Sequence, residues 1–156
     1  MRGDHRPSRP GWKTPGVPSI TGRVELNLTV RDPVRSAAWY AELFGMRERY
    51  DFASADDRMR YISLIEPSSE LVLCLVGHAA NPGEPFSEFR TGLDHLEFLV
   101  ARRDDLREWA ERLDELGIAH SGVKELSYTQ NAMLTFRDPD NIQLELFWRA
   151  PSEPDD

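Results

Sequence analysis

The sequence lacks several features that would assign it to a common class of protein. It has a single cysteine, Cys74, in 156 residues, so no disulfide can form within the chain. It has no apolar run long enough to cross a membrane and no secretory signal at its start, so the expected location is the cytoplasm. Phosphate-binding glycine loops, nucleophile elbows and paired-cysteine zinc motifs are also missing.

An excess of basic residues is lacking as well. The 27 acidic side chains outnumber the 19 basic ones, and the net charge is −8. Nucleic-acid binding needs a basic surface, so a nucleic-acid partner is not expected. The apolar and aromatic content is ordinary for a globular protein, which predicts a folded domain with a real core.

The pattern along the chain divides it into two tails and two similar halves. The first twenty residues contain four prolines and several basic residues, which predicts a flexible tail because such a segment cannot pair into a sheet. The predicted parts are a tail over 1–20, a first module over 21–80, a linker over 81–91, a second module over 92–149 and an acidic tail over 150–156.

The first module has the order of one strand, one helix and three strands. Residues 24–30 alternate apolar and polar side chains, which is the period of a half-buried strand. Asp32 is the expected helix cap, followed by Pro33 at the first helical position and by Gly45 as the stop. The buried helix face is predicted to contain Val34, Ala37, Ala38, Ala41 and Phe44. Three strands follow, around 48–52, 60–65 and 71–76.

The second module repeats this order. A strand is predicted over 94–100, and either Asp104 or Asp105 caps a helix that ends at Gly117. Its buried stripe is Leu106, Trp109, Ala110, Leu113 and Leu116. Strands around 119–124, 132–136 and 142–148 complete it. The two helix stops lie 72 positions apart, and the first strands about 70. This internal repeat predicts an α+β fold of two βαβββ modules.

Three segments at matching places in this repeat resemble a known family. They are DPVRSAAWYAELFGM (32–46), GLDHLEFLV (92–100) and FRDPDNIQLELF (136–147). Together they resemble the vicinal oxygen chelate superfamily of glyoxalases, bleomycin resistance proteins and extradiol dioxygenases, over about residues 21–148. The resemblance implies that the modules form a cupped, mostly antiparallel sheet around a cavity.

The resemblance also implies a metal site on the cupped face. It places candidate ligands at His95 and Glu145 in the second module and at Glu25 in the first, with Cys74 at the fourth position. Strand alternation independently puts Glu25, His95 and Glu145 opposite the apolar stripes. One histidine and two carboxylates suit Fe, Mn, Ni or Zn as a divalent ion with open positions, which would chelate two neighbouring substrate oxygens. Glu25 and Glu145 are then the candidate catalytic residues.

Each of these residues also has a simpler interpretation. His95 could be a hydrogen-bonded pocket histidine without metal. Glu25 could be a general base, or the partner of an arginine such as Arg60. Glu145 has apolar neighbours in sequence, so a buried role is favoured, and a cation or hydrogen-bond donors must then offset its desolvation. For Cys74 the role of a small buried apolar residue is favoured.

Two functions follow from these alternatives. The first is a divalent-metal-dependent enzyme of lyase, isomerase or ring-cleaving dioxygenase type, acting on a small organic substrate with vicinal oxygens. The second is a metal-free small-molecule or drug-binding protein of the bleomycin-resistance type. In either case Tyr50, Tyr61, Tyr128 and Phe147 are candidate ligand contacts, or else they fill the core. A homodimer is expected, because open sheet edges favour closure by a partner.

Overall fold

The computed structural model describes Pro18 and residues 24–151. The rest of the predicted N-terminal tail, the first three residues of the predicted first module and the last five residues of the chain lie outside the described part. The elements, in chain order, are β1 (Glu25–Thr29), α1 (Pro33–Phe44), β2 (Arg47–Ala53), β3 (Met59–Ile65), β4 (Val72–His78), β5 (Leu96–Leu99), α2 (Asp105–Glu115), β6 (Lys124–Leu126), β7 (Asn131–Arg137) and β8 (Gln143–Trp148). The order is the predicted β-α-β-β-β, given twice.

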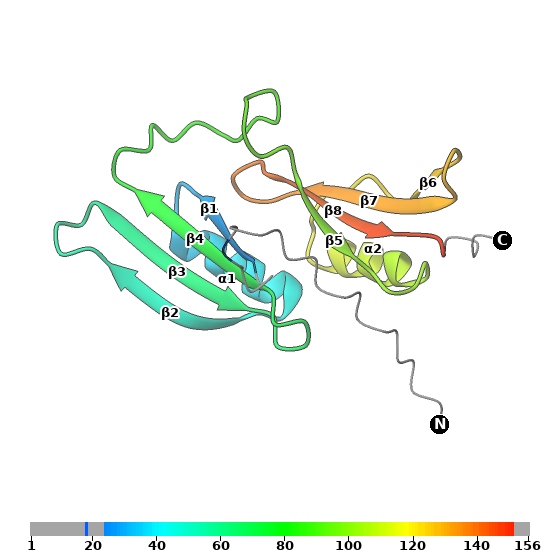
Figure 1. Cartoon of the computed structure of the whole chain (residues 1–156), viewed down its shortest axis with the longest axis horizontal. Helices are drawn as coiled ribbons and strands as arrows, with labels where there is room; N and C mark the ends of the chain where they lie inside the picture. The colour runs from blue at the N-terminus through cyan, green and yellow to red at the C-terminus, as the bar shows by residue number, and fades with distance from the viewer. Residues whose placement is uncertain (1–17, 19–23, 152–156) are drawn as a thin grey trace.

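Each half forms its own four-stranded sheet. The strand orders are β1-β4-β3-β2 and β5-β8-β7-β6. In both sheets the first and last strands of the module run parallel, and the other pairs are antiparallel. α1 packs on the first sheet and α2 on the second, and the two sheets lie side by side (Figure 1). The predicted α+β fold of two βαβββ modules is confirmed.

The sequence signals at the ends of α1 act as predicted. The Asp32 carboxylate accepts hydrogen bonds from the backbone amides of Val34 and Arg35, each at 3.0 Å. Pro33 occupies the first turn, where a missing amide proton costs nothing. Gly45 ends the helix in the left-handed conformation that glycine tolerates best.

The buried face of α1 differs from the predicted one. It consists of Pro33, Ser36, Ala37, Tyr40 and Leu43, whereas Val34 and Ala38 are exposed. Apolar periodicity alone misplaced the face because two of its members carry hydroxyl groups. Those hydroxyls have buried carboxylate partners in the second module, which makes their burial possible.

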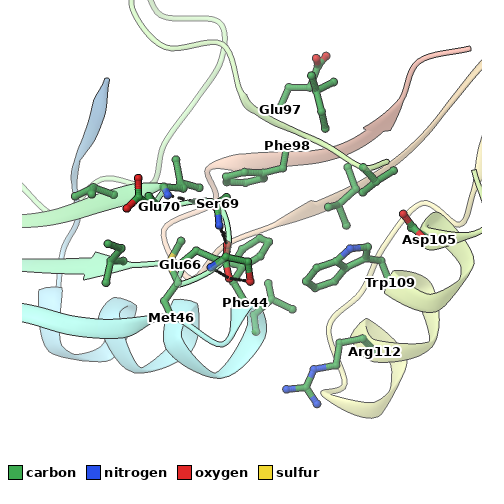
Figure 2. A pocket seen from close by; sticks show the side chains of 18 of the residues that line it. Phe44, Met46, Glu66, Ser69, Glu70, Glu97, Phe98, Asp105, Trp109 and Arg112 are labelled. Atoms are coloured by element: carbon green, nitrogen blue, oxygen red, sulfur yellow. Dashed lines mark hydrogen bonds between the residues drawn. The ribbon is translucent and has the colours of Figure 1, made fainter. Parts of the chain in front are cut away.

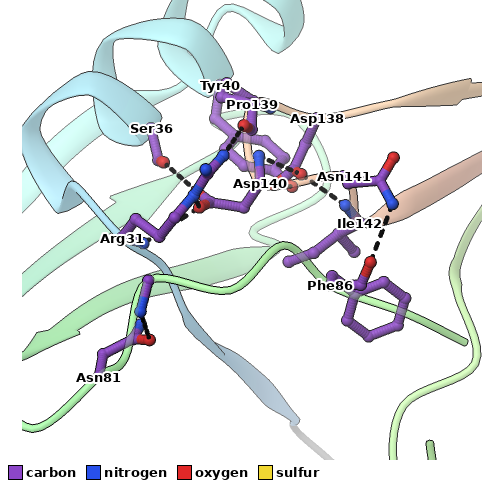
Figure 3. Close-up of polar contacts among 11 residues, drawn as sticks. Arg31, Ser36, Tyr40, Asn81, Phe86, Asp138, Pro139, Asp140, Asn141 and Ile142 are labelled. Carbon is purple, nitrogen blue, oxygen red and sulfur yellow. Dashed lines mark hydrogen bonds and ion pairs between the residues drawn. The ribbon is translucent and has the colours of Figure 1, made fainter.

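These carboxylates belong to the turn between β7 and β8 (Figure 3). Asp140 accepts hydrogen bonds from the backbone amide and Nε of Arg31, at 3.1 and 2.6 Å, and from the Ser36 hydroxyl at 3.2 Å. Asp138 accepts one from the Tyr40 hydroxyl at 3.0 Å. Burial raises the pKa of Tyr40 well above its usual value, and Asp138 adds to this effect. The network therefore ties α1 of the first module to the last hairpin of the second.

A single apolar core continues from one module into the other. Phe44 of α1 packs against Phe98 of β5 and Trp109 of α2, with ring centroids 5.0 and 5.4 Å apart. Leu106 and Leu113 of the predicted α2 stripe are completely buried. The two modules thus share one apolar core, although their sheets are separate.

Two smaller differences concern the second module. The strand expected around 119–124 begins only at Lys124, and His120 contributes a single bridge to Phe136. α2 begins after Asp104, whose side chain makes no capping hydrogen bond. No helix in the described residues is long and apolar enough to cross a membrane.

Candidate functional site

Strand register shows which positions of the two modules are equivalent. Asn27 of β1 pairs with Cys74 of β4, and Glu97 of β5 pairs with Glu145 of β8 in the same parallel arrangement. Glu25 and His95 each stand two residues before these pairs. The structure therefore places Glu25 and Cys74 in the first sheet where His95 and Glu145 lie in the second.

In the second module this position holds a histidine and a carboxylate facing one another. Nε2 of His95 lies 3.9 Å from Oε2 of Glu145. Nδ1 of His95 is 2.5 Å from a carboxylate oxygen of Asp94. If Nδ1 carries the proton that Asp94 accepts, Nε2 keeps a free lone pair on the side of Glu145. A carboxylate behind a histidine in this way is a common means of orienting a metal-binding imidazole.

Glu145 is a buried carboxylate with little to compensate its charge. The residue is only 7% exposed. Within the described residues, its one ion-pair contact is with His95. Burial raises the pKa of Glu145, the nearby imidazole of His95 opposes this, and Glu97 on the neighbouring strand adds to it. Such a group is stabilised by any cation that approaches it.

Glu25 stands apart from this pair within one chain. Its side chain is 54% exposed and lies 3.5 Å from an Nη atom of Arg49. The described part of the chain contains no group of three or more histidine, cysteine, aspartate or glutamate side chains placed to hold a metal ion. His95 and Glu145 are thus brought together, and Glu25 is presented separately on the first sheet.

The first-module counterpart of Glu145 has different chemistry. Cys74 is fully buried, and its Sγ lies 2.8 Å from the Tyr61 hydroxyl and 3.7 Å from the Ser63 hydroxyl. The hydrogen bond with Cys74 is the main cause of a raised pKa at Tyr61. Arg60, considered as a partner of Glu25, instead forms a two-point ion pair with Asp51.

The four aromatic candidates occupy different environments. Phe147 of β8 is buried beside Glu145, and Tyr61 is half-buried through its contact with Cys74. Tyr50 of β2 is largely exposed on an edge strand, and Tyr128 is 80% exposed in the turn after β6. Phe147 and Tyr61 therefore lie at the two equivalent sites, whereas Tyr50 and Tyr128 lie farther out.

Sequence reasoning missed two residues of this arrangement. Asp94 contacts the histidine ring through Nδ1. Its position directly before His95 in the sequence could have indicated this contact. Ser63 contacts Cys74 from the neighbouring strand, and only strand pairing brings it there.

Comparison with known proteins gives one family. The model of the glyoxalase/bleomycin resistance protein/dioxygenase superfamily matches residues 22–146. A glyoxalase/bleomycin resistance protein/dioxygenase domain from Frankia sp. EAN1pec is 33% identical and has a TM-score of 0.76. The match covers 86% of this chain and 96% of that one. A search of curated proteins found no match.

More distant structures share the fold. The fosfomycin resistance protein FosX from Listeria monocytogenes, in complex with Mn(II) and sulfate, is 20% identical with a TM-score of 0.61, covering 85% of this chain and 95% of that one. An integron cassette protein from the mobile metagenome of a sewage outfall in Halifax Harbour is 20% identical with a TM-score of 0.63, covering 83% and 99%. At these identities the similarity concerns the fold alone.

Proposed function

Because the chain belongs to the glyoxalase/bleomycin resistance protein/dioxygenase superfamily, we propose that it is a divalent-metal-dependent enzyme acting on a small organic substrate with vicinal oxygens. The observation that carries the proposal is the His95–Glu145 pair. A buried carboxylate faces an imidazole nitrogen whose ring is held from behind by Asp94. This donor set fits Fe, Mn, Ni or Zn.

The fit is chemical as well as geometric. Glu145 has a raised pKa because burial disfavours its charge, and a bound cation removes that penalty. A divalent ion supplies a Lewis acid for two neighbouring oxygens. The FosX structure from Listeria monocytogenes, which has this fold, was solved with Mn(II), and that supports a divalent ion as the ligand proposed here.

Two protein ligands hold a divalent ion weakly, so we assign the third position to Glu25 of a second copy of the chain. Glu25 occupies in the first sheet the place that His95 occupies in the second, and it is accessible. β1 and β5 are both edge strands, and an open edge favours pairing with another chain. The proposed enzyme is therefore a homodimer with sites shared between subunits.

Glu25 and Glu145 are also the groups proposed to move the substrate proton. Both carboxylates would lie beside a substrate bound at the ion, which is where a general base has to be placed. Phe147 and Tyr61 lie beside the two equivalent sites and are proposed to contact the organic part of the substrate, with Tyr50 and Tyr128 at the periphery.

The first experiment measures metal binding. Protein purified without chelator is titrated with Mn(II), Fe(II), Ni(II) and Zn(II) and followed by calorimetry and elemental analysis. We expect one ion per chain in the wild type and a loss of about a hundredfold in affinity in His95→Ala and Glu145→Gln. His78→Ala is the control, because this histidine is exposed at the end of β4. No bound ion under any loading condition would refute the enzyme.

A second experiment tests the sharing of sites between subunits. Glu25→Gln and His95→Ala chains are unfolded together, refolded and compared with each variant alone. If Glu25 acts across the dimer, a mixed dimer regains one intact site, and random pairing restores about a quarter of wild-type occupancy. If all ligands come from one chain, every chain in the mixture lacks one and nothing is regained.

The metal-free alternative rests on a different observation. In the first module the equivalent of Glu145 is Cys74, closed by Tyr61 and Ser63, which leaves that half without a carboxylate at this position. A protein that binds a planar organic compound between aromatic side chains needs no ion there. A chain that binds no metal but binds aromatic drugs stoichiometrically would establish this second function.

A further inference from the structure

The face of the second sheet that carries His95 and Glu145 is the one turned away from α2. Along β8, Leu144 and Leu146 are buried in the core, and α2 packs on β7 and β8. Because successive side chains of a strand point to opposite faces, Glu145 and Phe147 share the other face. We call it the helix-free face, since α2 covers the opposite one.

β5 follows the same alternation. Figure 2 shows Phe98 turned toward Phe44, with which it packs, and Glu97 pointing away from both. Glu97 pairs with Glu145 in the parallel register, so both carboxylates lie on the helix-free face. An anionic substrate would be repelled from this part of the face unless cations lay close by.

Two such cations are present beside Phe147. Arg149 continues the alternation of β8 beyond Glu145 and Phe147, and its Cζ lies over the Phe147 ring, 5.9 Å from the centroid. Lys124 of β6 pairs with Met133 of β7, and Met133 pairs with Phe147. Arg149 therefore approaches Phe147 along the strand, and Lys124 approaches it across the sheet.

Neither cation has an acidic partner among the described residues. On the same face, Arg137 forms a two-point contact with Glu88, at 2.7 and 3.3 Å. Glu125, which follows Lys124, contacts Arg103 instead. The described basic side chains that lack an acidic partner are Arg35, Arg47, Arg107, Lys124 and Arg149. Two of these thus lie on the face of the proposed metal site, where their charge is available to a ligand.

The spacing along β8 indicates the length of that ligand. Residues two apart on a strand are separated by about 6.7 Å and residues four apart by about 13 Å. Because the Arg149 guanidinium leans back over Phe147, we place the anion-binding end between these distances from Glu145. One substituted aromatic ring spans such a gap, with the apolar side chains of Phe147 and Met133 beneath it.

We propose that the substrate is an organic anion, whose carboxylate is bound by Arg149 and Lys124 while its vicinal oxygens lie at the His95–Glu145 pair. The guanidinium of Arg149 can donate two parallel hydrogen bonds to a carboxylate, and Lys124 adds a second charge. Together they offset the repulsion from Glu97. The position of the vicinal oxygens rests on the proposed function, whereas binding of the carboxylate requires no metal ion.

The test compares two probes that share a ring and vicinal oxygens and differ in charge, 3,4-dihydroxybenzoate and 3,4-dihydroxybenzamide. Calorimetry measures their binding to the full-length protein, both loaded with Zn(II) and in chelator. We expect the wild type to bind the acid about tenfold more tightly than the amide. This preference should shrink in Arg149→Gln and in Lys124→Gln and disappear in the double variant, because each change removes one cation.

The matched control is Arg107→Gln. Arg107 is also exposed and without an acidic partner in the described part of the chain, but it lies on α2, behind the sheet. The substitution changes the net charge as Arg149→Gln does and should leave the preference for the acid unchanged. Raising the salt concentration from about 0.05 to 0.5 M should reduce the preference in the wild type and in the control alike.

The anion-binding proposal and the proposed function fail in different ways. If both probes bind equally well with and without Zn(II), the metal site is contradicted, and the ratio of acid to amide still tests Arg149 and Lys124. The anion-binding proposal is overturned if the acid has no advantage in the wild type. It is also overturned if the double variant keeps that advantage, since the carboxylate is then bound elsewhere, or if neither probe binds in either form.

Discussion

The imidazole of His95 lies between two carboxylates, one exposed to solvent and the other buried. Asp94 contacts Nδ1 at 2.5 Å from an exposed position, and Glu145 faces Nε2 at 3.9 Å from a buried one. The exposed Asp94 contacts the ring, and burial disfavours the charge of Glu145. This asymmetry separates the second module from the first, in which Glu25 and Cys74 occupy the same sheet positions.

Replacing Glu145 with Gln is expected to stabilise the metal-free protein at neutral pH. Burial raises the pKa of Glu145, so the folded state favours the protonated carboxyl, and stability is lost as the pH rises through that raised pKa. Gln removes the buried charge and gains on the order of 1 kcal/mol at pH 7. Urea unfolding in chelator at pH 7 and pH 4 measures this. The gain should vanish at pH 4, and a variant that is less stable at both values would contradict the argument.

The hydrogen bonds of Asp140 are expected to contribute much more to the free energy of unfolding than an exposed ion pair does. Asp140→Ala removes the acceptor for the Arg31 amide, the Arg31 guanidinium and the Ser36 hydroxyl in a buried place, and we expect a loss of about 2–3 kcal/mol in unfolding free energy. Asp51→Ala breaks the exposed pair with Arg60 and serves as the comparison. Equal losses in chemical denaturation would show that Asp140 does not connect the modules.

Gly77 in β4 is expected to tolerate no side chain. A Cβ atom there would lie 2.8 Å from Cδ and 3.0 Å from Cγ of Pro33, which is buried at the start of α1. Gly77→Ala should cost about 1–3 kcal/mol, because the proline ring cannot turn away. In a double-mutant cycle Pro33→Ala should recover part of that loss. Additive losses in the cycle would mean that this contact is not the cause.

The turn over 66–71 is expected to loosen in acid. The Glu66 carboxylate accepts hydrogen bonds from the amides and hydroxyls of Ser68 and Ser69, which lower its pKa to about 2. A depressed pKa contributes stability above the ordinary value near 4.5 that is lost as the pH falls towards 2. The protection factors of the amides in this turn, which compare exchange with the intrinsic rate at each pH, should therefore fall between about pH 5 and pH 2 in the wild type. Glu66→Gln should have lower protection factors throughout, and these should change less with pH; a parallel fall in both proteins would exclude Glu66 as the cause.

Prediction from sequence succeeded where the signal is local. Asp32, Pro33 and Gly45 mark the ends of α1, and alternation in residues 24–30 marks β1, because caps and strand periods depend on neighbouring residues. The same reasoning misplaced the buried face of α1. Ser36 and Tyr40 are buried only because Asp140 and Asp138, about a hundred residues later, receive their hydroxyl groups.

The sequence by itself determined the repeated βαβββ order, which follows from local pattern, and the family, and the resemblance to that family implies the positions of the candidate metal ligands. Only the tertiary structure decided which of those side chains meet. Parallel pairing of β5 with β8 brings His95 to Glu145, whereas Glu25 on β1 lies near Arg49, and its counterpart Cys74 is enclosed by Tyr61 and Ser63. Strand pairing and burial are long-range properties, and the interactions they create decide the chemistry that each position can perform.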